Sequence, residues 1–377
     1  MSKVVTFDLA PPPGTINLGI GQPSADLLPV DLMHAASDRF FDSAEPFDLN
    51  YGEVRGGAEF LSVLAGFLTE GYGSPADANE LFVTGGNSQA MDLVSAVFAN
   101  PGDTVFVEEP TYFLAFKIFQ DRGLNIVGIP IDDDGLRVDA LEEALESHNP
   151  AFLYTIPSFH NPGGQSTSAE RRRRIVELAV KHDFLIVADE VYQMLYYHEA
   201  PPPAYGTMTS SKKVLSLGSF SKILAPAMRL GWIQASNDLL QQIEAYGFVN
   251  SGGCINHFGA HIARYAVESG ALNKHIESLR NAFRARLDVM HDALNEHFAD
   301  IASWSKPTGG YFVWIKFDES VDTRKIRAAA WDAETGYQSG ATFSSQGHLG
   351  NYMRLSFAHY NEDDIQKGVA RLRPLFD

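Results

Sequence analysis

The chain has 377 residues, enough for two domains and a sizeable core, and its 45% hydrophobic and 20% charged residues are typical of a globular protein. Its formal net charge of −18 argues against nucleic acid or an anionic membrane as a partner. One cysteine, Cys254, excludes an intrachain disulfide and any multi-cysteine zinc site, so we expect no metal centre. No apolar run is long enough to span a bilayer, and the first residues, "MSKVVTFDLAPPPG", lack the apolar core of a signal peptide, so we expect a cytoplasmic protein.

From about Leu81, short apolar runs alternate with amphipathic stretches. We predict buried strands at "LFVT", "TVFVEE", "AFLYTI", "FLIVADE", "KVLSLG" and "LGWIQA". Between two of them, "SAERRRRIVELAVKH" has a helical pattern, and we assign its four arginines to a solvated face. This alternation predicts an α/β fold with a mostly parallel sheet that helices cover on both faces.

After about Gly270 the pattern changes. Apolar residues at spacings of three and four predict one long amphipathic helix: Leu279, Phe283, Leu287, Met290, Leu294 and Phe298. The stretches "YFVWIKF" and "YMRLSF" then read as alternating strands. We therefore expect an N-terminal arm with part of a small domain at 1–45, a large domain at 46–268, and the rest of a small α+β domain at 269–377.

Polar residues follow several of the predicted strands, and ligands of open α/β sheets bind outside the carboxyl ends of the strands. Asp189 ends an apolar run and needs a cationic partner, because a desolvated carboxylate is costly. Tyr112 follows "TVFVEE", and Asn161 follows "AFLYTI" in a loop rich in proline and glycine. Lys222 follows "KVLSLG" and, taken alone, is either a surface lysine or a desolvated amine.

Together these residues describe one ligand. A planar ring would stack on Tyr112, Asp189 would keep a ring nitrogen protonated, and an aldehyde would lie within reach of Lys222. The turn "TGGNSQAMDL" opens a helix whose free N–H groups suit a phosphate. That phosphate would be held at the helix start by Asn87 and Ser88, and by Ser219, Ser221 and Arg229. The ligand with these requirements is pyridoxal phosphate, and nearby Arg229 would lower the pKa of Lys222.

The sequence resembles the class I/II aminotransferases, which are fold type I pyridoxal-phosphate enzymes of the aspartate aminotransferase kind. The similarity runs in order from "INLGIGQPS" to "YMRLSFA". "SFSKILAPAMRLGW" resembles the family's lysine motif, which implies that Lys222 bonds to the cofactor aldehyde and Arg229 binds the phosphate. "VADEVY" implies that Asp189 pairs with the ring nitrogen and Tyr192 with the ring oxygen, and "HNPGG" implies that Asn161 lies beside that oxygen.

The resemblance also implies a substrate site and a homodimer. Arg354 in "MRLSFA" fits the arginine that forks onto the substrate α-carboxylate, and Gly21 fits a backbone contact to the same group. Tyr51 in "NYGEVRGG" fits the tyrosine that reaches the phosphate of the neighbouring subunit. His160 departs from the family pattern, and two interpretations are open: a residue lining the substrate pocket, or a loop histidine bonded to backbone.

The implied activity is ping-pong transamination (EC 2.6.1.-), with Lys222 carrying the proton from Cα. No second arginine can be assigned to a distal carboxylate. A β- or γ-lyase or a cyclising synthase would use the same residues, so these alternatives stay open. A non-catalytic cofactor-binding regulator is a further alternative, which the acidic charge and the short lead before "INLGIGQP" disfavour.

Overall fold

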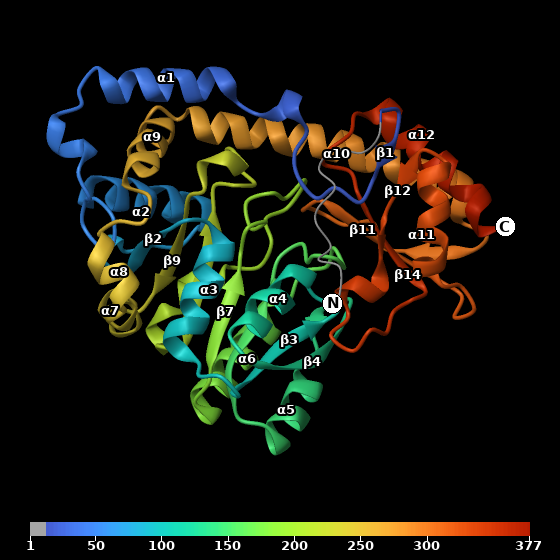
Figure 1. Ribbon diagram of the computed structural model, residues 1–377, viewed down its shortest axis with the longest axis horizontal. Coiled ribbons are helices and arrows are strands. Elements are labelled where there is room, and N and C mark those ends of the chain that lie inside the picture. Colours follow the sequence, from blue (N-terminus) through green and yellow to red (C-terminus); the bar gives the residue numbers. More distant parts are fainter. Residues whose placement is uncertain (1–12) are drawn as a thin grey trace.

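The computed structural model describes residues 13–377, so the stretch examined for a signal peptide lies largely outside the described residues. Within these residues the largest sheet has eight strands, and β8, β7, β6, β3 and β4 are parallel neighbours (Figure 1). The remaining pairings are antiparallel. The strands are, in spatial order, β2 (Leu81–Thr84), β9 (Gly231–Ala235), β8 (Val214–Ser219), β7 (Leu185–Asp189), β6 (Pro150–Thr155), β3 (Thr104–Glu109), β4 (Asn125–Asp132) and β5 (Gly135–Leu136). The expected mostly parallel sheet is confirmed.

Strand β4 is not among the six runs predicted as strands. Its sequence, NIVGIPID, contains Gly128 and Pro130, which weaken a strand pattern, and only one of its residues is buried. A side chain at Gly128 would place its Cβ 2.8 Å from Glu109 Oε2 of the neighbouring β3. The glycine therefore permits a close approach between strands, which the apolar pattern does not reveal.

Helices cover both faces of the sheet, as expected. Along β3, Val105 packs in a core with α2, α3 and α4, whereas the next residue, Phe106, packs in a second core with α5 and α6. The helices of the large sheet are α2 (Ala58–Tyr72), α3 (Asn87–Phe98), α4 (Phe113–Asp121), α5 (Val138–Ser147), α6 (Ala169–His182), α7 (Asn237–Ala245), α8 (Gly247–Gly252) and α9 (His257–Glu268). Short 3-10 turns lie at η1 (Ala25–Leu27), η2 (Pro46–Leu49), η3 (Ala78–Glu80), η4 (Tyr205–Ser211), η5 (Pro226–Met228), η6 (Gly340–Phe343) and η7 (Arg373–Phe376).

One arginine of α6 corrects the sequence analysis. Arg172 is fully buried, so the assignment of all four arginines to a solvated face is wrong at this position. Its guanidinium donates to the carbonyl oxygens of Pro157, Thr167 and Pro203 and to Ser158 Oγ. These carbonyl groups come from two loops, one after β6 and one before η4, and a single arginine fork satisfies them together.

The C-terminal part forms an antiparallel sheet with the order β10 (Ala302–Trp304), β11 (Phe312–Phe317), β14 (Tyr352–Ser356) and β13 (Gln338–Ser339). The predicted long helix is α10 (Ala271–Phe298), and all six of its predicted core residues are buried. Two further helices complete this part, α11 (Thr323–Asp332) and α12 (Glu362–Leu372). Figure 1 shows α10 running from α9 towards the small sheet.

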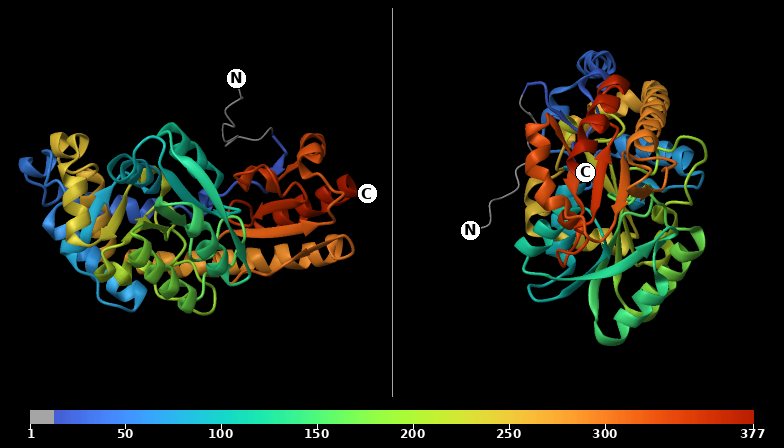
Figure 2. Two further views of the ribbon diagram at one scale, coloured as in Figure 1. Left: turned by 90° about the horizontal axis from the view of Figure 1, so that it is seen from below. Right: turned by 90° about the vertical axis from the view of Figure 1, so that its right-hand side faces the viewer.

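Segments from the two ends of the chain lie side by side. Strand β1 (Ile16–Asn17) pairs in parallel with β12 (Thr335–Gly336), and Figure 2 shows the blue N-terminal segment beside the red C-terminal elements. Helix α1 (Val30–Phe41) packs on α9 (Figure 1). The domain boundaries at residues 45 and 268 stay a prediction. Within residues 13–377, no helix combines the length and hydropathy needed to cross a membrane.

Candidate active site

A cavity of about 320 Å³ lies at the carboxyl ends of the central strands, where the small sheet meets them. Asp189 comes from the end of β7, Ser219 from the end of β8, and Arg354 from β14. The residues predicted for the cofactor or substrate that line this cavity are Gly21, Asn87, Ser88, Tyr112, Asn161, Asp189, Tyr192, Ser219, Ser221, Lys222, Arg229 and Arg354. The fold thus brings together residues that lie up to 333 positions apart in the sequence.

Two residues singled out in the sequence lie elsewhere. Tyr51 is 76% exposed and lines a separate cavity of about 540 Å³ beside His257 and His261. His160 is buried and does not line the active-site cavity, and its Nδ1 accepts a 3.2 Å hydrogen bond from the Gly163 N–H. Of its two interpretations, the loop histidine bonded to backbone is the one found.

The Lys222 amine lies between the two parts of the structure. Its Nζ donates a 3.0 Å hydrogen bond to the Gly21 carbonyl and lies 5.4 Å from the centre of the Tyr311 ring. Burial lowers the pKa of Lys222 to about 8, and the positive charges of Arg354 and Arg229 act in the same direction. At pH 7 about one tenth of an amine with this pKa is unprotonated, far more than for an ordinary lysine, and this free amine can attack an aldehyde.

The Asp189 carboxylate is buried and accepts hydrogen bonds from two neutral donors. Asn87 Nδ2 lies 2.7 Å from one oxygen, and Tyr154 Oη lies 2.9 Å from the other. Burial raises the pKa of Asp189, while these two donors and the charge of Lys222 oppose the rise. A cationic ring nitrogen beside this carboxylate would complete its set of partners.

The N-terminus of α3 has features that suit an anion. Gly86, the residue before the helix, has a φ of +88°, and a Cβ there would lie 3.1 Å from Arg229 Nη2. Ser219 Oγ, which also lines the cavity, donates to Ser221 Oγ at 3.0 Å. Since the Asn87 side chain is bonded to Asp189, Asn87 can offer the anion only its backbone N–H.

Arg354 is almost fully buried, with its guanidinium 4.0 Å from the Phe312 ring and 4.8 Å from the Phe343 ring. Its Nη1 donates to Asn161 Oδ1 at 2.9 Å and its Nη2 to the Gly19 carbonyl at 2.7 Å. Burial lowers the pKa of Arg354 to about 10. Its Nε has no hydrogen-bond partner, so a buried donor is left for a carboxylate.

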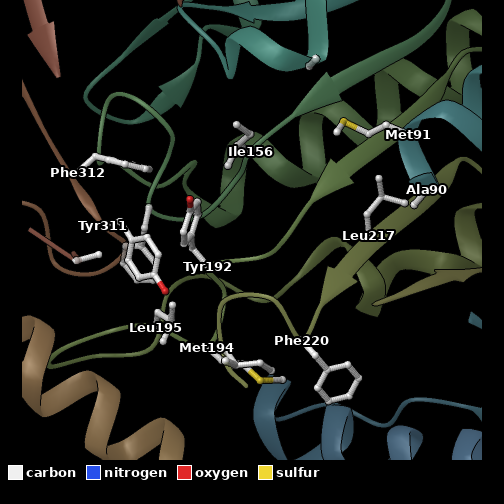
Figure 3. Close-up of a cluster of buried hydrophobic side chains, with 14 of the residues drawn as sticks. Ala90, Met91, Ile156, Tyr192, Met194, Leu195, Leu217, Phe220, Tyr311 and Phe312 are labelled. Carbon is white, nitrogen blue, oxygen red and sulfur yellow. The ribbon is translucent and has the colours of Figure 1, made fainter. Parts of the chain in front are cut away.

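The remaining walls are mainly apolar or aromatic. Burial raises the pKa of Tyr112 to about 12 and the pKa of Tyr192 well above its usual value, so both hydroxyls stay protonated. Figure 3 shows the Tyr192 and Tyr311 rings next to each other, with hydroxyl groups that point in different directions. The sequence analysis did not name the lining residues Gln22, Met91, Ile156, Val191, Pro226 and Phe312. In the sequence, what can point to such residues is a position close to a motif residue. Val191, for example, lies between Asp189 and Tyr192.

Comparison with known proteins identifies the class. Residues 13–372 match the model of the family "Aminotransferase class I and II". An aromatic-amino-acid aminotransferase of Thermococcus litoralis is 36% identical over 363 residues, covering 95% of this chain and 87% of that protein. The kynurenine aminotransferase of Pyrococcus horikoshii, solved with PMP, is 32% identical with a TM-score of 0.90, covering 96% of this chain and 90% of that one. An HTH-type transcriptional regulator of Bacillus subtilis, YdfD, is 29% identical, covering 95% of this chain and 73% of its own.

The fold is that of the fold type I pyridoxal-phosphate transferases. The chain belongs to the class I and II aminotransferase family and is a pyridoxal-phosphate-dependent aminotransferase. Four observations indicate that its cavity fits this cofactor. Asp189 lacks a cationic hydrogen-bond partner, Gly86 leaves the helix start open, Lys222 has a lowered pKa, and Arg354 has an unpaired buried donor.

Proposed function

We propose that the preferred amino donor is a neutral α-amino acid with an aromatic or bulky apolar side chain. Among the described residues that line the cavity, the cationic side chains are Lys222, Arg229 and Arg354. This observation carries the proposal, because each cation has a role in binding the cofactor or the α-carboxylate, and none is left for a distal carboxylate. The aromatic donors in the names of two similar proteins agree with it.

The proposed roles follow from the contacts. Asp189 would pair with the ring nitrogen of the cofactor, and Tyr112 would stack on the ring. Tyr192 and Asn161 would bind the ring oxygen. The N–H groups of Asn87 and Ser88, the hydroxyls of Ser219 and Ser221, and Arg229 would hold the phosphate. When bound, pyridoxal phosphate supplies an aldehyde that takes up the amino group and a ring that draws electrons from Cα.

Arg354 and Lys222 have separate roles towards the substrate. The Arg354 guanidinium, fixed between two aromatic rings, binds the α-carboxylate and so orients the Cα–H bond, while the Gly21 backbone contacts the same group. Lys222 Nζ would accept the proton from the substrate Cα and hold it at the substrate end of the cavity. The 3.0 Å bond to the Gly21 carbonyl keeps the amine at the substrate end of the cavity.

We also propose a homodimer in which Tyr51 reaches the partner's phosphate site. Large apolar side chains are exposed on the part of the surface that carries Tyr51, namely Phe41, Phe47, Leu49, Phe248 and Phe258. Such a concentration is typical of an interface. A cytoplasmic location stays a prediction.

The test is an absorbance titration of the cofactor-loaded protein with single amino acids. We expect phenylalanine or tyrosine to bleach the visible band, and a 2-oxo acid to restore it. Aspartate should react at least about tenfold more slowly, the discrimination that an unpaired buried charge produces. A band that returns unaided while ammonia accumulates would instead indicate a lyase. Equal reaction with aspartate would contradict the proposed donor class.

A matched variant sharpens the test of donor class. Gln22 lines the cavity and is uncharged, so Gln22→Arg introduces a cation there. The variant should gain reactivity towards acidic donors and retain that towards phenylalanine.

A further inference from the structure

Two buried ionisable side chains lie outside the cavity and have no role in the chemistry above. His160 Nε2 lies 3.1 Å from Glu108 Oε2, and the two side chains are 2% and 1% exposed. This contact is close but is not a regular hydrogen bond, and Nε2 has no other hydrogen-bond partner. We propose that the Glu108–His160 pair is a positioning element for the substrate-carboxylate site and that it acts through Asn161. This inference rests on the roles proposed for Arg354 and Asn161.

The contacts of His160 define its proton position. Nδ1 accepts the Gly163 N–H, so it carries a lone pair, and a ring proton lies on Nε2, facing Glu108. The His160 backbone N–H donates to the Gln165 carbonyl at 2.8 Å, and its carbonyl accepts from Gly164 at 2.7 Å. His160 therefore closes the loop 160–165 on itself and ties that loop to strand β3.

Glu108 holds the start of the same loop. Its Oε1 accepts from Thr155 Oγ1 at 2.7 Å, and its Oε2 accepts from the Ile156 N–H at 2.7 Å. One buried carboxylate thus fixes the end of β6 and, through His160, the segment that carries Asn161. The three contacts also satisfy a group that would be costly to bury without partners.

The backbone of the residue just before His160 is strained. Phe159 has a φ of +50°, which is unfavourable for a bulky side chain and persists only where the surroundings enforce it. A Cβ on Gly309 would lie 2.6 Å from the Phe159 ring, so a small-domain turn packs closely against it. Because the ring cannot move towards that turn, contacts on the other side of the loop, from Arg172 and from the Glu108–His160 pair, fix where the loop lies.

Asn161 connects the loop to the substrate-carboxylate site. The hydrogen bonds of the Arg354 guanidinium go to Asn161 Oδ1 and to the Gly19 carbonyl, and only Asn161 belongs to the loop that Glu108 and His160 hold. A loop displaced by a fraction of an ångström would move this acceptor and turn the fork away from the carboxylate. Misplacements of about 1 Å cost catalytic sites up to about 100-fold.

The experiment compares two substitutions at His160. A glutamine amide reaches about as far as Nε2, so His160→Gln keeps a donor towards Glu108, whereas His160→Asn keeps only the acceptor for Gly163. The probe is 3-phenylpropanoate, a monocarboxylate, titrated calorimetrically into the cofactor-loaded protein. We expect His160→Asn to raise its Kd about tenfold and His160→Gln less than about twofold. Equal affinities, or equal losses in both variants, would overturn the inference.

Further variants separate a positioning role from a structural one. If His160 acts through Asn161, adding His160→Asn to Asn161→Ala should weaken binding no further, whereas additive losses would contradict the proposal. Should His160→Asn not fold, Glu108→Gln removes the charge facing Nε2 and is expected to raise the Kd in the same way. Arg354→Gln tests the underlying assignment, since unchanged affinity there would refute the role of Arg354 itself.

Discussion

Asn87 and Asp189, 102 positions apart, are joined by a 2.7 Å hydrogen bond from Asn87 Nδ2 to Asp189 Oδ1. Tyr154 donates to the other carboxylate oxygen at 2.9 Å, so α3, β6 and β7 all converge on one buried side chain. Both donors stabilise the carboxylate against the effect of burial. The arrangement preserves a negative charge whose proposed purpose is to hold a protonated ring nitrogen.

Removing the charge of Asp189 should therefore lower kcat more than removing one of the two groups that donate a hydrogen bond to it. Asp189→Asn is expected to lower kcat about 100-fold or more, because the ring nitrogen loses its anionic partner. Tyr154→Phe keeps the charge and the Asn87 bond and should cost about tenfold, the lower end of the value of one hydrogen bond to a charged group. Steady-state kinetics of both variants measure the difference, and equal losses would contradict the assigned role of Asp189.

The sequence names Asp189 and Asn87 but not Tyr154, and the reason is physical. Polar residues at strand ends stand out from an apolar run, whereas Tyr154 lies within "AFLYTI" and reads as part of the core. Its direction becomes visible only when β6 is placed beside β7, with Tyr154 opposite Val187. The Glu108–His160 contact escapes the sequence for the same reason, since it depends on which strands are neighbours.

For the fold, too, the sequence predicts the features that local patterns determine and misses those that depend on tertiary contacts. Periodicity predicts α10 and the central strands because their burial repeats at a fixed interval. It does not reveal β4, whose pattern glycine and proline interrupt, or the buried Arg172, whose partners come from distant loops. Such features depend on tertiary contacts that no local pattern carries.

The Lys222 pKa leads to a pH prediction for the apoprotein. Only the unprotonated amine bonds to an aldehyde, and burial lowers the pKa of Lys222 to about 8 from 10.5. The rate of covalent cofactor attachment should rise with pH and level off above about 8. Stopped-flow absorbance of the apoprotein mixed with pyridoxal phosphate measures this rate, and a midpoint near 10 would contradict the prediction.

Two variants control the pH experiment. Arg354→Gln removes a positive charge that disfavours the ammonium form, so the midpoint should move to higher pH. Lys222→Ala should attach no cofactor covalently at any pH. A Lys222→Ala protein that still forms the visible band and turns over substrate would refute the whole mechanism.

Gly21 allows a test of the carboxylate site by one methyl group. A Cβ there would lie 2.8 Å from Phe312 Cζ, and Phe312 forms one of the two aromatic walls of Arg354. Gly21→Ala must displace that ring, so we expect KM for the amino donor to rise about tenfold, with a smaller change in kcat. Unchanged KM would mean that the Phe312 ring does not set the position of Arg354.

Gly66 supplies the matched control for this substitution. It lies within α2, and a Cβ there would meet no atom within 4 Å. Gly66→Ala should leave KM and kcat unchanged and should stabilise the fold by about 0.5–1 kcal/mol, the usual gain of alanine over glycine in a helix. Thermal unfolding together with steady-state kinetics checks both expectations.

Tyr51 can be assigned to its own or to the partner's site by mixing two defective subunits. In the proposed dimer, a Lys222→Ala subunit still supplies an intact Tyr51, and a Tyr51→Ala subunit still supplies an intact Lys222. A hybrid of the two then contains one complete site. If Tyr51 served its own subunit, neither site of the hybrid would be complete.

The measurement is activity at limiting pyridoxal phosphate, because weaker cofactor binding lowers activity most when the cofactor is scarce. Because Tyr51 is 76% exposed in the single chain, Tyr51→Ala should fold normally and weaken cofactor binding about tenfold, as expected for a lost hydrogen bond to a charged group. Hybrids tagged on both subunits and purified through both tags should bind cofactor at one site with the affinity of the unmodified protein. Affinity no better than that of the Tyr51→Ala homodimer would place Tyr51 outside the partner's phosphate site.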